Sequence, residues 1–125
     1  MQRLILPIGI TLLLGLCAVL FASHQHKIPS VAAGRDLYEA NGCASCHGLS
    51  GHGDGILAGR LPSKPIDFRD ASAFTRGASQ DDIVEALIED TMMPRFDHLS
   101  ETERQSIALY VISIRSEGRK GKNRP

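Results

Sequence analysis

The clearest hydrophobic feature of the chain is an uncharged run near its N-terminal end. Leu4–Ala22 holds 19 residues without a charge, roughly 28 Å as a helix at about 1.5 Å per residue, close to the roughly 30 Å hydrocarbon core of a bilayer. A signal peptide has a shorter apolar stretch followed by a small-x-small cleavage site, which is poorly matched here. We therefore expect residues 1–23 to form an uncleaved membrane anchor, with a removed signal segment as the alternative.

The orientation of this anchor follows from the charges beside it. Arg3 and the amino terminus favour a cytoplasmic N-terminus. The rest of the chain would then lie outside the cytoplasmic membrane, beginning with a short polar linker over residues 24–30.

Beyond the linker, apolar residues recur at helical spacing, and no segment alternates convincingly as a β-strand would. The first such segment predicts a helix over Val31–Asn41 that ends at Gly42, a residue suited to a C-cap. Gly48–Gly55 contains four glycines in eight residues and is predicted to be a loop. The pattern favours an all-α domain with long connections.

Two capping boxes mark the starts of two later helices. Ser79 with Asp82 opens a helix that should stop near Asp90, because Pro94 disfavours helical geometry just before it. Ser100 with Glu103 opens the closing helix. Its apolar stripe follows the i, i+3, i+4, i+7 pattern and consists of Ile107, Tyr110, Val111 and Ile114.

Composition adds a limit on size and a separation of charge. A chain of 125 residues with no net charge has room for one domain with an appendage, and gives no overall case for nucleic-acid binding. From Val31 to Ile114 there are 7 basic and 13 acidic residues, a balance of −6, whereas Arg115–Pro125 has 5 basic residues and 1 acidic. We predict an acidic domain over 31–115 that docks to an oppositely charged partner, and a basic flexible tail over 116–125.

The strongest chemical signal is the run Cys43-Ala44-Ser45-Cys46-His47, a C-x-x-C-H motif that marks covalent haem attachment. Two thiols three positions apart on one helical turn can each add to a haem vinyl group, and the adjacent histidine then faces the iron. A redox C-x-x-C pair usually lies in a βαβ context, which is absent here, and a zinc site would lack a strong fourth ligand because Cys17 lies in the apolar run. We expect Cys43 and Cys46 to hold one haem c and His47 to be an axial ligand. The haem would also stabilise a small domain whose five aromatic residues supply only a thin core.

The sequence around this motif resembles class I (monohaem) cytochromes c of the membrane-anchored or exported bacterial type. The similarity extends through Gly34–Gly48, Gly51–Gly55, Lys64–Phe68, Met93-Pro94 and the closing helix with Tyr110. It implies the class I cytochrome c fold, about four helices wrapped around one covalent haem. It also implies that the first and last helices cross near Gly34, Tyr38 and Tyr110.

One position departs from this family's pattern. Many relatives have a proline soon after the glycine loop, and its carbonyl holds the proximal histidine. Here Ile56 follows Gly55, and the first proline is Pro62. Further along, we interpret Arg60 and Lys64 as ordinary surface charge, with pairing to haem propionates as the alternative.

The sixth iron ligand is predicted to be Met93. It lies 46 residues after His47 and precedes Pro94, which keeps it off the helix, and the family's ligand is the methionine of a Met-Pro pair. Met92 and His98 are the rival ligands, and an open iron site is the remaining alternative. Ligation by histidine and methionine raises the reduction potential of haem, as suits an electron carrier.

These features predict a one-electron carrier and not an enzyme, with no catalytic residue. Its expected redox partners are a quinol-oxidising complex or dehydrogenase as donor and an oxidase or reductase as acceptor. The expected location is the inner membrane, single-pass with the haem domain in the periplasm, or the soluble periplasm if the N-terminal segment is cleaved. The alternative functions are a haem c subunit built permanently into a larger membrane oxidoreductase, and a catalytic or gas-sensing haem protein with an open iron site.

Overall fold

The computed structural model describes residues 13–18 and 28–122. Residues 13–18 are helical. The elements that follow are α2 (Val31–Ala40), α3 (Cys43–His47), the 3-10 turns η1 (Ala58–Arg60) and η2 (Ala71–Ala73), α4 (Gln80–Glu89) and α5 (Glu101–Lys122). No strand occurs within the two described ranges, which confirms the prediction of an all-α domain.

The predicted capping boxes open the helices at the expected residues. The Ser79 hydroxyl accepts from the Asp82 amide, and the Asp82 carboxylate accepts from the Ser79 amide in return, which starts α4. The same reciprocal bonds join Ser100 and Glu103 at the start of α5. Helix α4 ends at Glu89 with Asp90 as its C-cap, as expected from the proline that follows.

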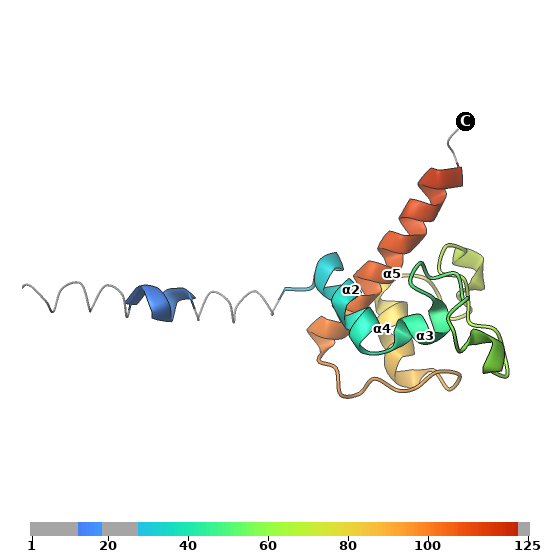
Figure 1. Cartoon of the computed structure of the whole chain (residues 1–125), viewed down its shortest axis with the longest axis horizontal. Coiled ribbons are helices and arrows are strands. Elements are labelled where there is room, and N and C mark those ends of the chain that lie inside the picture. Colours follow the sequence, from blue (N-terminus) through green and yellow to red (C-terminus); the bar gives the residue numbers. More distant parts are fainter. Residues whose placement is uncertain (1–12, 19–27, 123–125) are drawn as a thin grey trace, which may run out of the picture.

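The closing helix is longer than its sequence indicates. α5 continues to Lys122 and projects beyond the body of the domain (Figure 1). Residues 116–122, part of the predicted basic tail, extend this helix, while residues 123–125 lie outside the described part of the chain. Gly118 does not stop the helix, because a single glycine costs a helix only about 1 kcal/mol relative to alanine.

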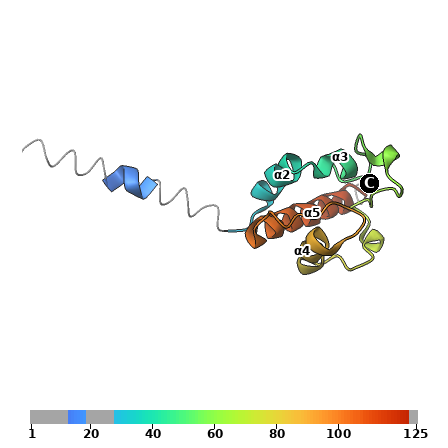
Figure 2. The same ribbon diagram turned by 90° about the horizontal axis from the view of Figure 1, so that it is seen from below.

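The first and last long helices cross where the family resemblance implies. Figure 2 shows α2 and α3 on one side of α5 and α4 on the other. A Cβ atom on Gly34 would lie 1.9 Å from the carbonyl oxygen of Ser106, so the two backbones approach this closely only because residue 34 has no side chain. Beside this crossing, the rings of Tyr38 and Tyr110 pack edge to face with centroids 5.2 Å apart.

The buried core is small and lies between these helices. Its members are Tyr38, Phe68, Ile83, Leu87, Leu99, Ile107, Ala108, Val111 and Ile114. Half-buried side chains from α3 and from the loop after α4, including Cys43, Met93 and Phe96, pack against it. The core therefore has α3 and the Met93 loop at its margin, where a large apolar cofactor would add to the packing.

Within the described ranges, no helix combines the length and the apolar character needed to cross a membrane. The predicted anchor, Leu4–Ala22, lies mainly outside the described residues, which include only positions 13–18 of it. Most of the predicted linker over 24–30 also lies outside them.

Candidate haem site

Helix α3 is a single short element that carries all three residues of the predicted attachment site. Cys43 and Cys46 are three positions apart on it, and both are free thiols with partly buried side chains. Burial raises the pKa of Cys43 to about 11, so this group is a thiol and not a thiolate near neutral pH. No group of three or more His, Cys, Asp or Glu side chains gathers as a metal site in the part of the chain that the structure describes.

His47 is the last residue of α3, and its ring packs against the protein. The imidazole stacks on the Phe68 ring, with centroids 4.5 Å apart and planes 21° from parallel. Burial lowers the pKa of His47, and a smaller opposing effect comes from the backbone of Ile66. The imidazole is therefore neutral at pH 7 and has a nitrogen lone pair for a metal ion.

The residues of α3 fit covalent haem. Nδ1 of His47 is buried and makes no hydrogen bond of ordinary geometry, an uncommon state for a buried polar atom. Two unpaired thiols on the same turn, with a neutral histidine beside the second, form the donor set that haem attachment needs. The backbone of Ile66 lies near the imidazole and acts against the effect of burial on the pKa of His47.

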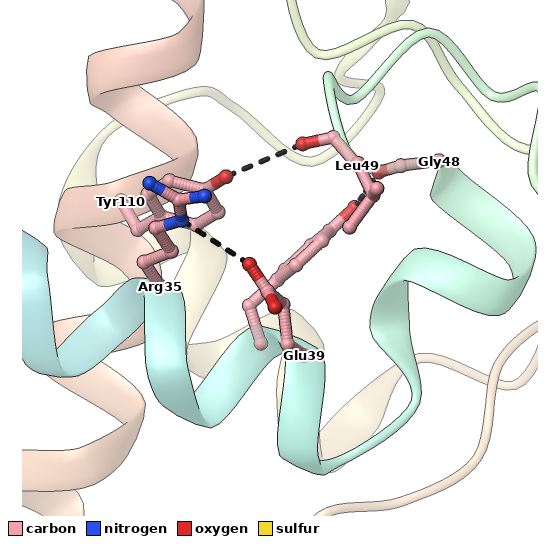
Figure 3. Close-up of polar contacts among 6 residues, drawn as sticks. Arg35, Glu39, Gly48, Leu49 and Tyr110 are labelled. Atoms are coloured by element: carbon pink, nitrogen blue, oxygen red, sulfur yellow. Dashed lines mark hydrogen bonds and ion pairs between the residues drawn. The ribbon is translucent and has the colours of Figure 1, made fainter.

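Two tyrosines from the crossing helices hold the backbone that follows His47. The buried Tyr38 hydroxyl donates to the Gly48 carbonyl at 2.7 Å, and the Tyr110 hydroxyl donates to the Leu49 carbonyl at 3.3 Å. Figure 3 shows Tyr110 reaching the backbone of Leu49 beside the Arg35–Glu39 ion pair. Burial raises the pKa of Tyr38, so its hydroxyl keeps the proton that it donates.

The sequence did not indicate these supporting contacts. The family resemblance includes Phe68 and implies that Tyr38 lies at the helix crossing, but it does not indicate the contact of either residue with the segment around His47. Their contacts with His47 and Gly48 depend on the fold, which brings together residues separated by a glycine-rich loop.

The three candidates for the sixth ligand lie in different surroundings. The Met93 side chain is half-buried and packs against the core. Met92 is 67% exposed, and the exposed His98 ring is hydrogen-bonded to Asn41 at 3.0 Å. Asp90, three residues before Met93, acts electrostatically on His47, which places the start of this loop near α3.

Comparison with known proteins gives the class of this chain. A family model for cytochrome c matches residues 31–115; the chain therefore belongs to the cytochrome c family. Proteins of this family bind covalently attached haem c and transfer electrons, and Cys43 and Cys46 form the C-x-x-C-H type of site that this attachment uses.

A solved structure shows a related domain in a larger protein. A chain of the Kuenenia stuttgartiensis reducing HAO-like protein complex Kustc0457/Kustc0458 is 35% identical, with a TM-score of 0.62. The match covers 67% of the present chain and 43% of that one, so the present chain corresponds to less than half of its length. No curated protein matches significantly.

Proposed function

We propose that this chain is a class I, monohaem cytochrome c that carries single electrons between redox proteins. The observation that carries the proposal is the composition of α3, where two free thiols and a neutral, partly buried histidine form one compact attachment site. When bound, haem supplies a one-electron iron couple. The residues of the chain hold and orient that group and perform no acid–base or nucleophilic chemistry.

Each site residue has a defined role in this proposal. Cys43 and Cys46 form the two thioether links, His47 is the proximal ligand and Met93 is the sixth ligand. The burial of Met93 against the core supports its role over that of the exposed Met92. Two protein ligands leave the iron no position for substrate, which favours a carrier over a catalytic or gas-sensing haem protein.

The proposed location follows from the sequence of the N-terminal segment. Leu4–Ala22 would anchor the chain in the inner membrane, with the haem domain on the periplasmic side. Its donor would be a quinol-oxidising complex or dehydrogenase, and its acceptor an oxidase or reductase. Cleavage of the segment would instead give a soluble periplasmic carrier.

A second candidate function is supported by the solved structure that resembles this chain. That protein is part of a complex named for two components, Kustc0457 and Kustc0458. The present chain would by analogy be a haem c subunit fixed in a larger oxidoreductase. Either function uses the same residues at α3.

Purification of the full chain from its native membranes in mild detergent separates the two candidates. Size-exclusion chromatography followed at the haem absorbance should give a lone haem protein if the chain is a free carrier. Elution with other proteins in fixed stoichiometry would support the subunit. A purified chain without haem would contradict both.

A further inference from the structure

The segment that follows the glycine loop is fixed directly against the haem-attachment helix. The Gly55 amide donates to the Cys46 carbonyl at 3.1 Å, and the Leu57 amide donates to the Ser45 carbonyl at 2.8 Å. A Cβ atom on Gly55 would lie 2.3 Å from the Ser45 carbonyl oxygen, so the two backbones touch. Both views show η1 beside α3 (Figures 1 and 2). This segment therefore borders the side of the haem that the two cysteines would hold.

The same segment exposes apolar side chains to solvent. Ile56 is 87% exposed, and Leu57 and Leu61 are each 38% exposed. These three residues lie within six positions and flank η1 on both sides. Clustered exposed apolar residues mark interaction sites more often than single ones do.

The segment also carries two positive charges that no carboxylate neutralises. Arg60 and Lys64 are exposed and have no hydrogen bond or ion pair in the described residues. Four other arginines within 28–118 are engaged with carboxylates: Arg35, Arg69, Arg76 and Arg95. Arg104 bonds to the Leu99 carbonyl, and Arg115 lies over the Phe74 ring. Within 28–118, Arg60 and Lys64 are thus the basic residues whose side chains make no hydrogen bond, ion pair or ring contact.

Several of the acidic residues that make the domain negative lie away from this segment, on α4. The exposed carboxylates of α4 are Asp81, Glu85 and Glu89. In Figure 2, α4 lies across α5 from α3. Asp54, the acidic residue nearest in sequence to Ile56, has its carboxylate against Gly48. The net charge of −6 consequently does not describe the surface beside the haem-attachment helix.

We propose that Ile56, Leu57, Arg60, Leu61 and Lys64 form the electron-exchange surface of this protein, and that it docks a redox protein presenting carboxylates around an apolar centre. The proposal rests on the proposed function of electron carrier. It revises the partner chemistry predicted from net charge, because steering depends on charges near the contact. A redox protein is favoured over an anionic membrane because the surface borders the attached haem, and lipids accept no electrons.

Gold electrodes with defined coatings test this surface on the haem-loaded full chain. The coatings are carboxylate-terminated, amine-terminated, and mixed carboxylate- and methyl-terminated alkanethiol layers. Voltammetry measures the amount of haem that exchanges electrons with the electrode, and a quartz-crystal microbalance measures the total amount of protein bound. The ratio of the first amount to the second is the electroactive fraction. We expect the largest electroactive fraction on the mixed layer and the smallest on the amine layer.

Matched variants assign this behaviour to the surface. Arg60→Gln/Lys64→Gln should lower the electroactive fraction on carboxylate layers by about threefold or more, since each lost charge weakens oriented docking. Arg35→Gln/Arg76→Gln removes the same charge from residues that are paired with carboxylates, and should change the electroactive fraction little. Ile56→Ser should remove the advantage of the mixed layer, whereas Leu49→Ser, at another exposed apolar residue, should retain it.

The results separate failure of this surface from failure of the proposed function. Equal effects of the two double variants, or a preference for the amine layer, would overturn the surface while leaving an electron carrier. Absence of any reversible haem signal on every coating would contradict the carrier itself. Binding to phosphatidylglycerol vesicles that the Arg60/Lys64 variant loses, with its electrode response unchanged, would assign the patch to a membrane and overturn the proposal.

Discussion

At the scale of single residues, the hydrogen bond of the buried Tyr38 hydroxyl is expected to stabilise the fold. It donates to the Gly48 carbonyl directly after His47 at 2.7 Å. Tyr38→Phe should lower the free energy of unfolding by about 1 kcal/mol, the usual net value of one hydrogen bond. Tyr110→Phe is the control, because its bond is longer, at 3.3 Å, and exposed. Denaturant titration of both holoproteins measures the difference, and a larger loss for Tyr110→Phe would contradict this assignment.

The ligand assignment is a second residue-scale prediction. Met93→Ala should remove the weak near-infrared sulfur-to-iron band of the oxidised protein and lower its reduction potential, since a methionine ligand raises that potential. Met92→Ala should do neither, because its side chain is 67% exposed. Absorption spectroscopy and potentiometry of the two variants decide this. Loss of the band in Met92→Ala alone would contradict this assignment and identify Met92 as the ligand.

The attachment residues could be predicted from sequence because they lie within five consecutive positions. Cys43, Cys46 and His47 owe their arrangement to one helical turn. The stacking of Phe68 on His47 joins residues 21 positions apart through the path of an irregular loop. No local periodicity describes such a path, so this contact could not be predicted.

At the scale of elements, the crossing of α2 and α5 depends on the absence of a side chain at Gly34. A Cβ atom there would lie 1.9 Å from the Ser106 carbonyl oxygen. Gly34→Ala should therefore destabilise the protein by about 1–3 kcal/mol, as overpacking does. Gly59→Ala is the control, since a Cβ atom at Gly59 meets nothing within 4 Å. Thermal unfolding of the holoproteins compares them; equal melting temperatures would show that the helices shift apart at little cost.

Helix starts could be predicted more reliably than helix ends. The starts of α4 and α5 could be predicted from Ser79 and Ser100, because a capping box consists of local hydrogen bonds between side chains and backbone. The end of α5 has no comparable signal, and the basic composition after residue 115 suggested a tail where the helix continues. The 3-10 turns η1 and η2, each of three residues, are too short to produce a periodic pattern.

At the scale of the whole molecule, the N-terminal segment determines whether the chain is anchored in a membrane. If Leu4–Ala22 is retained as an anchor, the mature protein should begin at or near Met1 and stay with membranes through a high-salt wash, because burial of apolar side chains resists salt. Intact-mass measurement of the purified holoprotein gives the start directly. A mature start near Gly34 would indicate a cleaved signal and a soluble carrier.

Charge also has to be considered over the whole molecule. The excess of acidic over basic residues in the domain can be counted from the sequence. Only the fold shows that the carboxylates of α4 lie across α5 from α3. Arg60 and Lys64 differ from the other basic residues within 28–118 in that their side chains make no hydrogen bond, ion pair or ring contact there. The position of their segment against α3 depends on the fold, so the charge of this surface could not be predicted from net charge.

The central claim is that the chain carries one electron at a haem iron with two protein ligands. An optical redox titration of the holoprotein, run with and without carbon monoxide, tests it most directly. The account predicts a single reversible one-electron transition and a reduced spectrum that carbon monoxide leaves unchanged, because His47 and Met93 would both bind the iron and leave no free position. A reduced spectrum that shifts under carbon monoxide, or a transition of more than one electron, would contradict it.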